Sequence, residues 1–356
     1  MTSPADDTLR MLQAGGYVAA VAVPVAVACG LVARWRFGTL CPRWRMPPFV
    51  WPGLAVFGVF LTYYFLALLA SIAIPIADRL GLYQAIYPNG FPTPPAGGTD
   101  EDARQVAFSL KAYWLGLVWM PLFLIAAGVV RVRVFDSPPD WRTELRQFPR
   151  TIALGTLGWA TFGVLAVAIH VGLVFLFDAL GWPITEHALA RMGANGDGVG
   201  GVLITLSACV CAPLVEEFLF RGLLVPWAVG HKKRWYRPWC LLSAAAALAL
   251  LGGLKADGSF NSPAIVFVLV LAAGAYLIQR AGPRWPKFPA RTALAVWSSS
   301  ALFAAAHSAV WPTPVPLFVL ALGLGYLAAR TRSWAAGAVT HILFNAVSTV
   351  WVFLRG

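Results

Sequence analysis

Two adjacent carboxylates stand inside a long apolar stretch of this chain. Of the 15 acidic residues, 13 lie in polar segments or at the edges of apolar blocks; only Glu216 and Glu217 lie within one, together with Arg221. An acidic residue at the centre of a membrane segment costs roughly 2.5–3.5 kcal/mol on insertion scales, so such residues usually mark a functional site. The pair is therefore the first place to look for chemistry.

Helical geometry predicts different roles for the two carboxylates. At about 100° per residue, Glu217 and Arg221 are neighbours on one face of an α-helix, whereas Glu216 points about 140° away from Arg221. We therefore predict that Glu217 pairs with Arg221, and that Glu216 needs a partner from another helix. A carboxylate without a fixed cation is suited to act as a general base. The alternative is a purely structural polar cluster between helices.

Two later apolar segments offer such partners. His307 ends the sequence Phe303-Ala-Ala-Ala-His307, and His341 and Asn345 are four residues apart on one helical face. A glutamate, two histidines and an asparagine supply a base, an orienting imidazole and hydrogen-bond donors for a developing oxyanion, as acyl hydrolysis by water requires. Glu216, His307 and His341 could instead hold a zinc ion with one open coordination position.

These residues form three motifs in order along the chain. They are Glu216-Glu217-Phe-Leu-Phe-Arg221-Gly, Phe303-x-x-x-His307 and His341-x-x-x-Asn345, with Ala212-Pro213 before the first. Together they resemble the CAAX prenyl endopeptidase and bacteriocin-processing family, also called CPBP or Abi. The resemblance covers residues 199–356.

The resemblance implies an all-helical intramembrane endopeptidase. By it, Glu216 and His307 activate the hydrolytic water, His341 and Asn345 stabilise the oxyanion, and the remaining motif residues, Glu217 and Arg221, support the site. Family members have been described both as metalloproteases and as metal-independent glutamate proteases, so zinc is a cofactor that the resemblance leaves open. It does not require a prenylated substrate.

The elements that must position these residues are membrane helices. Hydrophobic residues make up 59% of the 356 residues and charged residues 12%, about half the charged share of a soluble protein. We predict an all-α, polytopic bundle of about ten spans, each near the length needed to cross a bilayer. Their approximate ranges are 15–33, 50–76, 112–130, 151–177, 199–229, 239–254, 264–279, 292–310, 316–329 and 334–354.

The distribution of basic residues predicts the topology. With ten spans, one set of connecting segments carries 19 Lys and Arg residues, while the other set, with both termini, carries 7. By the positive-inside rule the basic set is cytoplasmic and both termini lie outside. We expect a multi-pass protein of the bacterial cytoplasmic membrane. The net charge of +12 is therefore explained by the bilayer and predicts no nucleic-acid partner.

The motifs also suggest a division of the chain. Residues 1–150 are predicted to form an N-terminal three-helix membrane region, and residues 151–356 a core with an extra helical hairpin at about 239–280. The segment 84–102, rich in Pro and Gly, is predicted to be an exposed loop. Cys209 and Cys211 are two residues apart on different helix faces, which suits packing better than a zinc site.

The predicted function is hydrolysis of peptide bonds in membrane-associated peptides or proteins. Two other classes of function use the same cluster. One is a non-catalytic membrane protein with an immunity, partner-binding or scaffold role. The other is a transporter, because buried Glu and His can relay protons; the absence of obvious inverted repeats in the sequence counts against it.

Overall fold

The computed structural model describes residues 51–84, 100–135, 141–182, 205–230, 236–254, 260–281 and 289–355, together with isolated positions elsewhere. Within these residues every regular element is a helix, and one isolated antiparallel bridge joins Leu254 to Phe260. The predicted all-α class is confirmed. Most of the predicted span 15–33 and of the predicted loop 84–102 lies outside the described residues.

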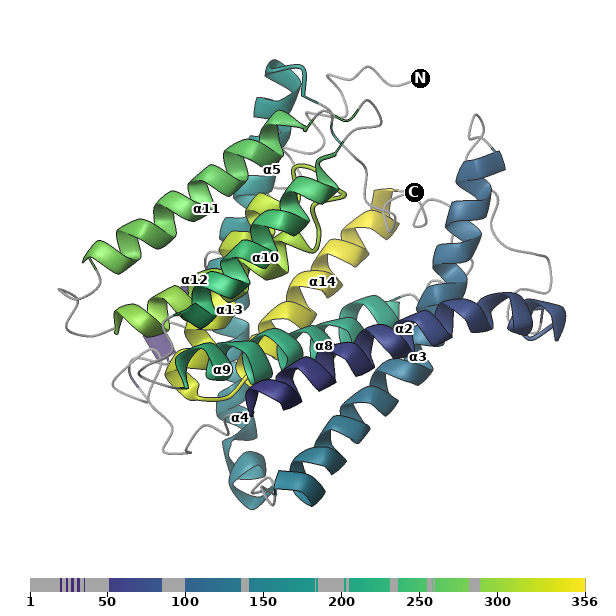
Figure 1. The fold of residues 1–356 in the computed structure, drawn as a ribbon, viewed down its shortest axis with the longest axis horizontal. Helices are drawn as coiled ribbons and strands as arrows, with labels where there is room; N and C mark the ends of the chain where they lie inside the picture. Colours follow the sequence, from purple (N-terminus) through teal and green to yellow (C-terminus); the bar gives the residue numbers. More distant parts are fainter. Residues whose placement is uncertain are drawn as a thin grey trace. The chain divides into compact units, whose positions relative to one another are not determined.

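The helices follow one another along the chain as Figure 1 traces them. They are α2 (Gly53–Arg79), α3 (Asp100–Phe135), α4 (Trp141–Gly158), α5 (Val164–Ala179), α8 (Ala212–Glu217), α9 (Val225–Val229), α10 (Tyr236–Gly252), α11 (Ser262–Ala281), α12 (Ala290–Ala305), α13 (Pro314–Thr331) and α14 (Ala335–Arg355). Three π-helical segments interrupt them: η1 (Trp159–Gly163), η2 (Ser207–Cys211) and η3 (Phe218–Leu224).

Five described helices are long and apolar enough to cross a membrane. They are Gly53–Arg79, Lys111–Phe135, Arg146–Ala179, Ser262–Ala281 and Pro314–Thr331. Each coincides with a predicted apolar block, which confirms those five blocks as candidate spans. The predicted block 239–254 corresponds to the shorter apolar helix Tyr236–Gly252. The total of about ten spans stays a prediction.

Two of the long helices end in the same way. After α2, Gly81 has φ +67° and its N–H donates to Asp78 O, while Leu82 N–H donates to Ala77 O. After α5, Gly181 has φ +63° with the equivalent pair of bonds to Asp178 and Phe177. This is the Schellman arrangement, in which a left-handed residue lets the chain satisfy the last carbonyls. Glycine is favoured at both points because a Cβ disfavours positive φ.

The chain divides into two compact units. The first contains residues 147–185 and 220–340 with the described positions before residue 52, and the second contains 52–146, 186–219 and 341–356. The helices α2 and α3 therefore belong to the same unit as Glu216, Glu217, His341 and Asn345. The predicted division into 1–150 and 151–356 stays a prediction.

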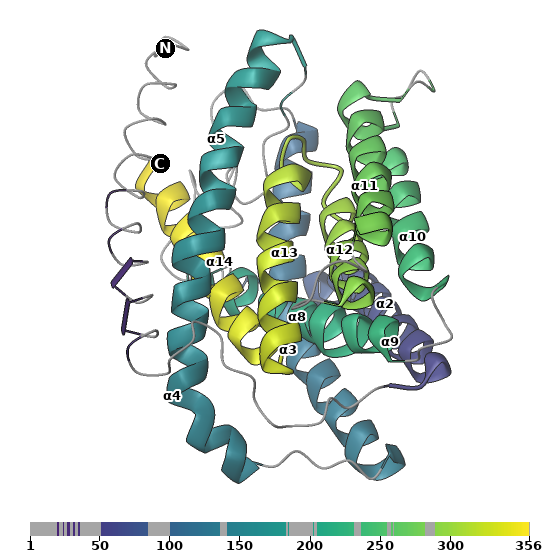
Figure 2. The same ribbon diagram turned by 90° about the vertical axis from the view of Figure 1, so that its left-hand side faces the viewer.

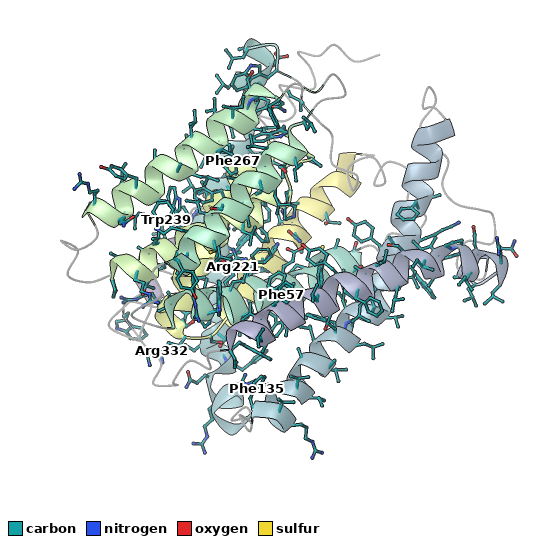
Figure 3. The ribbon with its side chains drawn as sticks, in the orientation of Figure 1. Phe57, Phe135, Arg221, Trp239, Phe267 and Arg332 are labelled. Atoms are coloured by element: carbon teal, nitrogen blue, oxygen red, sulfur yellow. The ribbon has the colours of Figure 1, made fainter. Side chains whose placement is uncertain are left out.

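In the first unit, α12 packs against α9, α10, α11 and α13, and Figure 2 shows it between α13 and α10. Small residues allow this close packing: a Cβ added to Gly325 of α13 would lie 2.6 Å from Val296 Cγ1 of α12. Membrane helices associate through such small residues. Phe267 of α11 (Figure 3) extends the core through edge-on ring contacts with Trp311 and Phe318.

In the second unit, α2 packs along α3, and α3 packs against η2 and α8. A Cβ added to Gly116 of α3 would lie 2.9 Å from Ser207 Oγ of η2, so the side chain of Ser207 occupies the space beside this glycine. At one end of the pair formed by α2 and α3, Lys111 Nζ lies 2.7 Å from Asp78 Oδ2. The N-terminal helices thus rest on the segment that carries the acidic pair.

Candidate active site

Glu216 and Glu217 end α8, between the π-helical segments η2 and η3. π-Helical turns are rare and occur frequently at functional sites. The sequence prediction assumed a regular α-helix, and in this respect it was wrong, since the interval from Phe218 to Arg221 lies in a wider turn. The angle of about 140° between Glu216 and Arg221 therefore does not apply. The predicted Glu217–Arg221 pair stays a prediction.

His341 of α14 lies between the two carboxylates. Its Nδ1 is 3.1 Å from Glu217 Oε1, and its Nε2 is 3.7 Å from Glu216 Oε2. An ionised carboxylate only accepts hydrogen bonds, so Nδ1 carries the proton and donates it to Glu217. Glu217 is fully buried, whereas the Glu216 side chain keeps 26% of its surface exposed. Glu217 can thus orient the imidazole, while Glu216 is accessible to water.

Asn345 lies one helical turn after His341 and donates from Nδ2 to the carbonyl of Ala208, 2.9 Å away. The sequence around η2 explains why this carbonyl needs a donor. Ala212 N–H bonds to Ser207 O, five residues back, and the next residue, Pro213, has no N–H. Ala208 O therefore lacks a partner in its own helix, and Asn345 supplies one. The second N–H of the amide is left for another acceptor.

Side-chain donors also reach carbonyls in or beside the other two π-helical segments. Ser299 Oγ donates to Phe220 O in η3 at 3.2 Å, and Thr340 Oγ1 donates to Gly155 O, one turn before η1, at 2.8 Å. A hydrogen bond to a buried carbonyl contributes to stability, so Ser299 and Thr340 help to hold these segments. Ser299 and Thr340 adjoin the second and third motifs, and sequence reasoning did not assign them this role.

Cys209 of η2 also contacts a polar side chain of α14. Its Sγ lies 3.3 Å from Thr349 Oγ1, four residues beyond Asn345. The positions 341, 345 and 349 form one stripe along α14 that faces η2 and α8. Cys209, Cys211 and Cys240 are free thiols, and the hydrogen bond of Cys209 agrees with the predicted packing role.

Arg221, labelled in Figure 3, belongs to the first unit. Its side chain is almost completely buried. Its Nη2 donates to Ala321 O at 3.2 Å, and its guanidinium carbon lies 4.8 Å from the centre of the Phe303 ring. A guanidinium over an aromatic face makes a cation–π contact. Arg221 is thus fixed by α12 and α13.

His307 also belongs to the first unit and contacts the same phenylalanine. Its ring centre is 5.1 Å from that of Phe303, and its Nδ1 is 2.9 Å from Phe303 O. A carbonyl only accepts, so Nδ1 is the protonated nitrogen and Nε2 is left as the base of the neutral ring. The predicted helix 292–310 is too long, because α12 ends at Ala305 and His307 lies in the following turn.

Sequence reasoning missed the aromatic packing of the second unit. The ring centre of Tyr63 on α2 lies 5.3 Å from that of Trp119 and 5.6 Å from that of Phe123, both on α3. Local patterns gave no signal for these contacts, because aromatic residues in apolar helices are common and only the packing of α2 on α3 brings them together.

A zinc ion was one predicted occupant of the site. The 3.7 Å between His341 Nε2 and Glu216 Oε2 is near the roughly 3.3–3.5 Å between two ligands of a tetrahedral zinc ion. The bond from Nδ1 to Glu217 is the usual orienting contact of a metal-bound histidine. These two residues could supply two of the ligands of a zinc ion. Across the part of the chain that the structure describes, no three His, Cys, Asp or Glu side chains gather as a metal-ligating group.

A family model matches the region that carries this site. Residues 198–282 and 275–347 match the family model described as Type II CAAX prenyl endopeptidase Rce1-like. The comparisons with curated proteins and with solved structures found no match. The five long apolar helices agree with an integral membrane protein. The match contains all three motifs, so the family model supports the resemblance of residues 198–347 to the Rce1-like Type II CAAX prenyl endopeptidases.

Proposed function

We propose that the protein is an intramembrane endopeptidase that hydrolyses peptide bonds of membrane-associated peptides or proteins. The placement of His341 between the carboxylates of Glu216 and Glu217 carries this proposal. It puts a solvent-accessible acid–base group next to an oriented imidazole within an apolar protein. The family match supports the same class of reaction.

Glu216 is the proposed general base. Its side chain is partly exposed, so a water molecule can reach it. Glu216 takes one proton from this water while the water oxygen bonds to the substrate's carbonyl carbon. The proton then passes to the leaving amine as the carbon–nitrogen bond breaks. His307 shares this work, because its Nδ1 bond to Phe303 leaves Nε2 as a proton acceptor.

His341 and Asn345 are the proposed donors to the oxyanion. Asn345 uses one N–H on Ala208 O and keeps the other. His341 gives Nδ1–H to Glu217, so donation from Nε2 requires the doubly protonated ring, whose charge the flanking carboxylates compensate. Donors held in advance toward a developing charge act without reorganisation. Glu217 and Arg221 support the site from buried positions.

A zinc-dependent version of the site is the alternative mechanism. Glu216 and His341, with His307 as the third predicted ligand, would hold the ion. A zinc ion would supply Lewis-acid polarisation of the carbonyl. Metal analysis of the purified protein, with and without chelator, separates the two versions. Chelation that removes zinc and activity together supports the metal site, whereas activity retained by metal-free protein supports the glutamate base.

The proposed setting follows from the charge distribution. The substrate is a membrane-associated peptide or protein, the bilayer is the second partner, and no nucleic acid takes part. Both termini face outward from a bacterial cytoplasmic membrane, and the site opens toward the cytoplasm. Accessibility of single introduced cysteines at each terminus to an impermeant reagent tests this orientation.

Cleavage of a membrane-tethered peptide library by purified wild type and Glu216→Gln tests the function. Loss of the general base should lower the rate by about 10²–10⁴-fold. Asp178→Asn is the matched control, because this exposed carboxylate lies at the end of α5. Equal cleavage by wild type and Glu216→Gln contradicts the proposal. Absence of cleavage by wild type across a validated substrate set favours a non-catalytic role.

A further inference from the structure

Two arginines meet at the end of α9 in the first unit. Arg237, the second residue of α10, donates from Nη1 to Trp227 O at 2.7 Å. Arg291, the second residue of α12, donates from Nη2 to Ala228 O at 3.5 Å. Because these two carbonyls belong to consecutive residues of one helix, the guanidinium groups lie beside each other. The helices α9, α10 and α12 pack against one another, so three elements hold this place.

Capping of α9 explains only part of this arrangement. Cationic side chains near the last carbonyls of a helix are favourable. Two like charges repel each other, however, and burial, followed by the charge of Arg237, lowers the pKa of Arg291. Arg237 is only 3% exposed. A buried charge is stable when an opposite charge accompanies it, so an anion is expected beside Arg237.

The unit itself supplies no carboxylate to Arg237. The two long segments of the first unit contain two acidic residues, Asp178 and Asp257. Asp178 makes no ion pair within the described residues. Asp257 comes after the opposite end of α10, whose 17 residues rise about 25 Å. The anion expected beside Arg237 is therefore one that the surroundings provide.

Buried donors at the same place also lack an acceptor. Arg237 Nε and Trp227 Nε1 make no hydrogen bond in the described part of the chain, although the guanidinium carbon lies 4.9 Å from the centre of the indole ring. The first turns of α10 and α12 contain no acidic residue, and the N-cap of α12 makes no side-chain hydrogen bond. Backbone N–H groups at such helix starts, together with guanidinium groups, suit a phosphate, whose oxygens accept. Arg291 is partly exposed and gives access from the surface.

Two tyrosine–arginine pairs indicate that this end of the unit lies at the membrane surface. The Arg280 guanidinium is 5.6 Å from the Tyr276 ring at the end of α11, and the Arg330 guanidinium is 5.9 Å from the Tyr326 ring at the end of α13. The helices α11 and α13 end where α10 and α12 begin, because each packs against the helix before it after a short connection. Tyr276 is 53% exposed and Tyr326 is 39% exposed. Exposed aromatic rings and arginines at the ends of apolar helices are typical of the layer of lipid headgroups.

We propose that Arg237 and Arg291 bind the phosphate of an anionic phospholipid, at the place where α9 ends and α10 and α12 begin. The membrane surface supplies this ligand at high local concentration, and basic clusters between membrane helices recognise such headgroups. The bound phosphate compensates both charges and links the three helices. Neither arginine belongs to the three motifs, and this role is separate from the proposed hydrolysis.

The experiment measures the melting temperature of the purified full-length protein in phosphatidylcholine nanodiscs with an increasing share of phosphatidylglycerol. We expect the melting temperature to rise with this share and then to level off, because a ligand that binds the folded state stabilises it. In Arg291→Gln the share that gives half of the rise should be about 10-fold higher or more, as for loss of a hydrogen bond to a charged group. Arg237→Gln should show the same change.

The matched control is Arg280→Gln. It removes one positive charge from the same end of the unit, but its guanidinium is exposed and lies on Tyr276. This variant should respond to phosphatidylglycerol as wild type does. An equal loss of response in Arg280→Gln would show that general surface charge causes the effect, and it would overturn the proposal. A wild-type melting temperature that is independent of phosphatidylglycerol would overturn it as well.

Two further measurements identify the ligand without relying on a variant. Inorganic phosphate is added to the protein in pure phosphatidylcholine nanodiscs: a full rise in melting temperature assigns the site to a soluble anion and contradicts a lipid site, whereas no rise supports the lipid. Native mass spectrometry of wild type taken from mixed lipids then compares the lipids that stay bound. Preferential retention of phosphatidylglycerol supports the proposal, and equal retention of both lipids contradicts it.

Discussion

The Nδ1 atom of His341 lies 3.1 Å from Oε1 of Glu217, which precedes it by 124 residues in the chain. Both side chains are buried, Glu217 completely. A buried charge is stable only when it is paired and hydrogen-bonded. This contact therefore fixes the protonated nitrogen of His341 and directs Nε2 toward Glu216.

Two substitutions of Glu217 should distinguish the effect of its charge from the effect of its hydrogen bond to His341. In Glu217→Gln an acceptor oxygen remains for His341, so we expect a folded protein with activity lowered by about 10-fold or more. In Glu217→Ala the Nδ1 proton loses its partner, which should cost a further 1–3 kcal/mol or so of stability. Thermal unfolding in detergent and the cleavage rate measure the two effects. Equal stability of the two variants would contradict the assigned bond.

His307 allows a test of one ring nitrogen at a time. In His307→Asn the amide can still donate to Phe303 O as Nδ1 does, but nothing replaces Nε2. We expect a normal melting temperature and a rate about 10²–10⁴-fold lower, because only the proton acceptor is lost. His307→Gln, which can place a polar atom near Nε2, is the comparison. Full activity of His307→Asn would exclude His307 from proton transfer.

Asn345 should affect both stability and rate. In Asn345→Ala the carbonyl of Ala208 loses its donor, which should cost about 1–3 kcal/mol. Loss of an oxyanion donor should lower kcat by about 10²–10³-fold. Asn345→Asp, with acceptors in place of the donor, should be at least as destabilised. Denaturation midpoints and kcat distinguish these effects, and a fully active Asn345→Ala would remove the residue from the oxyanion site.

Pro213 offers a test of the π-helical turn before the acidic pair. Pro213→Ala supplies a backbone N–H that can reach the carbonyls one turn back, so the side-chain donor from Asn345 is no longer required. We expect a higher melting temperature, because proline in a helix interior is unfavourable. We also expect lower activity, because with this N–H the π-helical turn η2 can become a regular α-helical turn. Unchanged activity together with raised stability would show that the turn is dispensable.

Much of the site could be predicted from local patterns. Glu216 and Glu217 are distinguished by their apolar surroundings, and the spacing of His341 and Asn345 correctly predicts that they share a face of one helix. The apolar blocks correctly locate five long helices. These features depend on composition and on the helical period, both of which can be read directly from a sequence.

Other features depend on tertiary packing or on departures from the regular period. The bond between Glu217 and His341 joins residues 124 positions apart on different helices, so it depends on tertiary packing and not on the helical period. The contacts of Tyr63 with Trp119 and Phe123 depend on how α2 and α3 pack. The end of α12 before His307 also had no clear signal, since its Ala-rich sequence favours a longer helix.

The two π-helical turns around α8 have a consequence for how the chain tolerates change in length. Each wide turn holds about one residue more than an α-helix of the same rise. Removal of a single residue from 207–211 would convert η2 to a regular turn without rotating the helix on either side, because the extra residue is what makes the turn wide. A deletion in a regular stretch of the same helix would instead rotate one side by about 100° relative to the other. The wide turns are thus the places where this helix can lose one residue and keep the direction of its carboxylates.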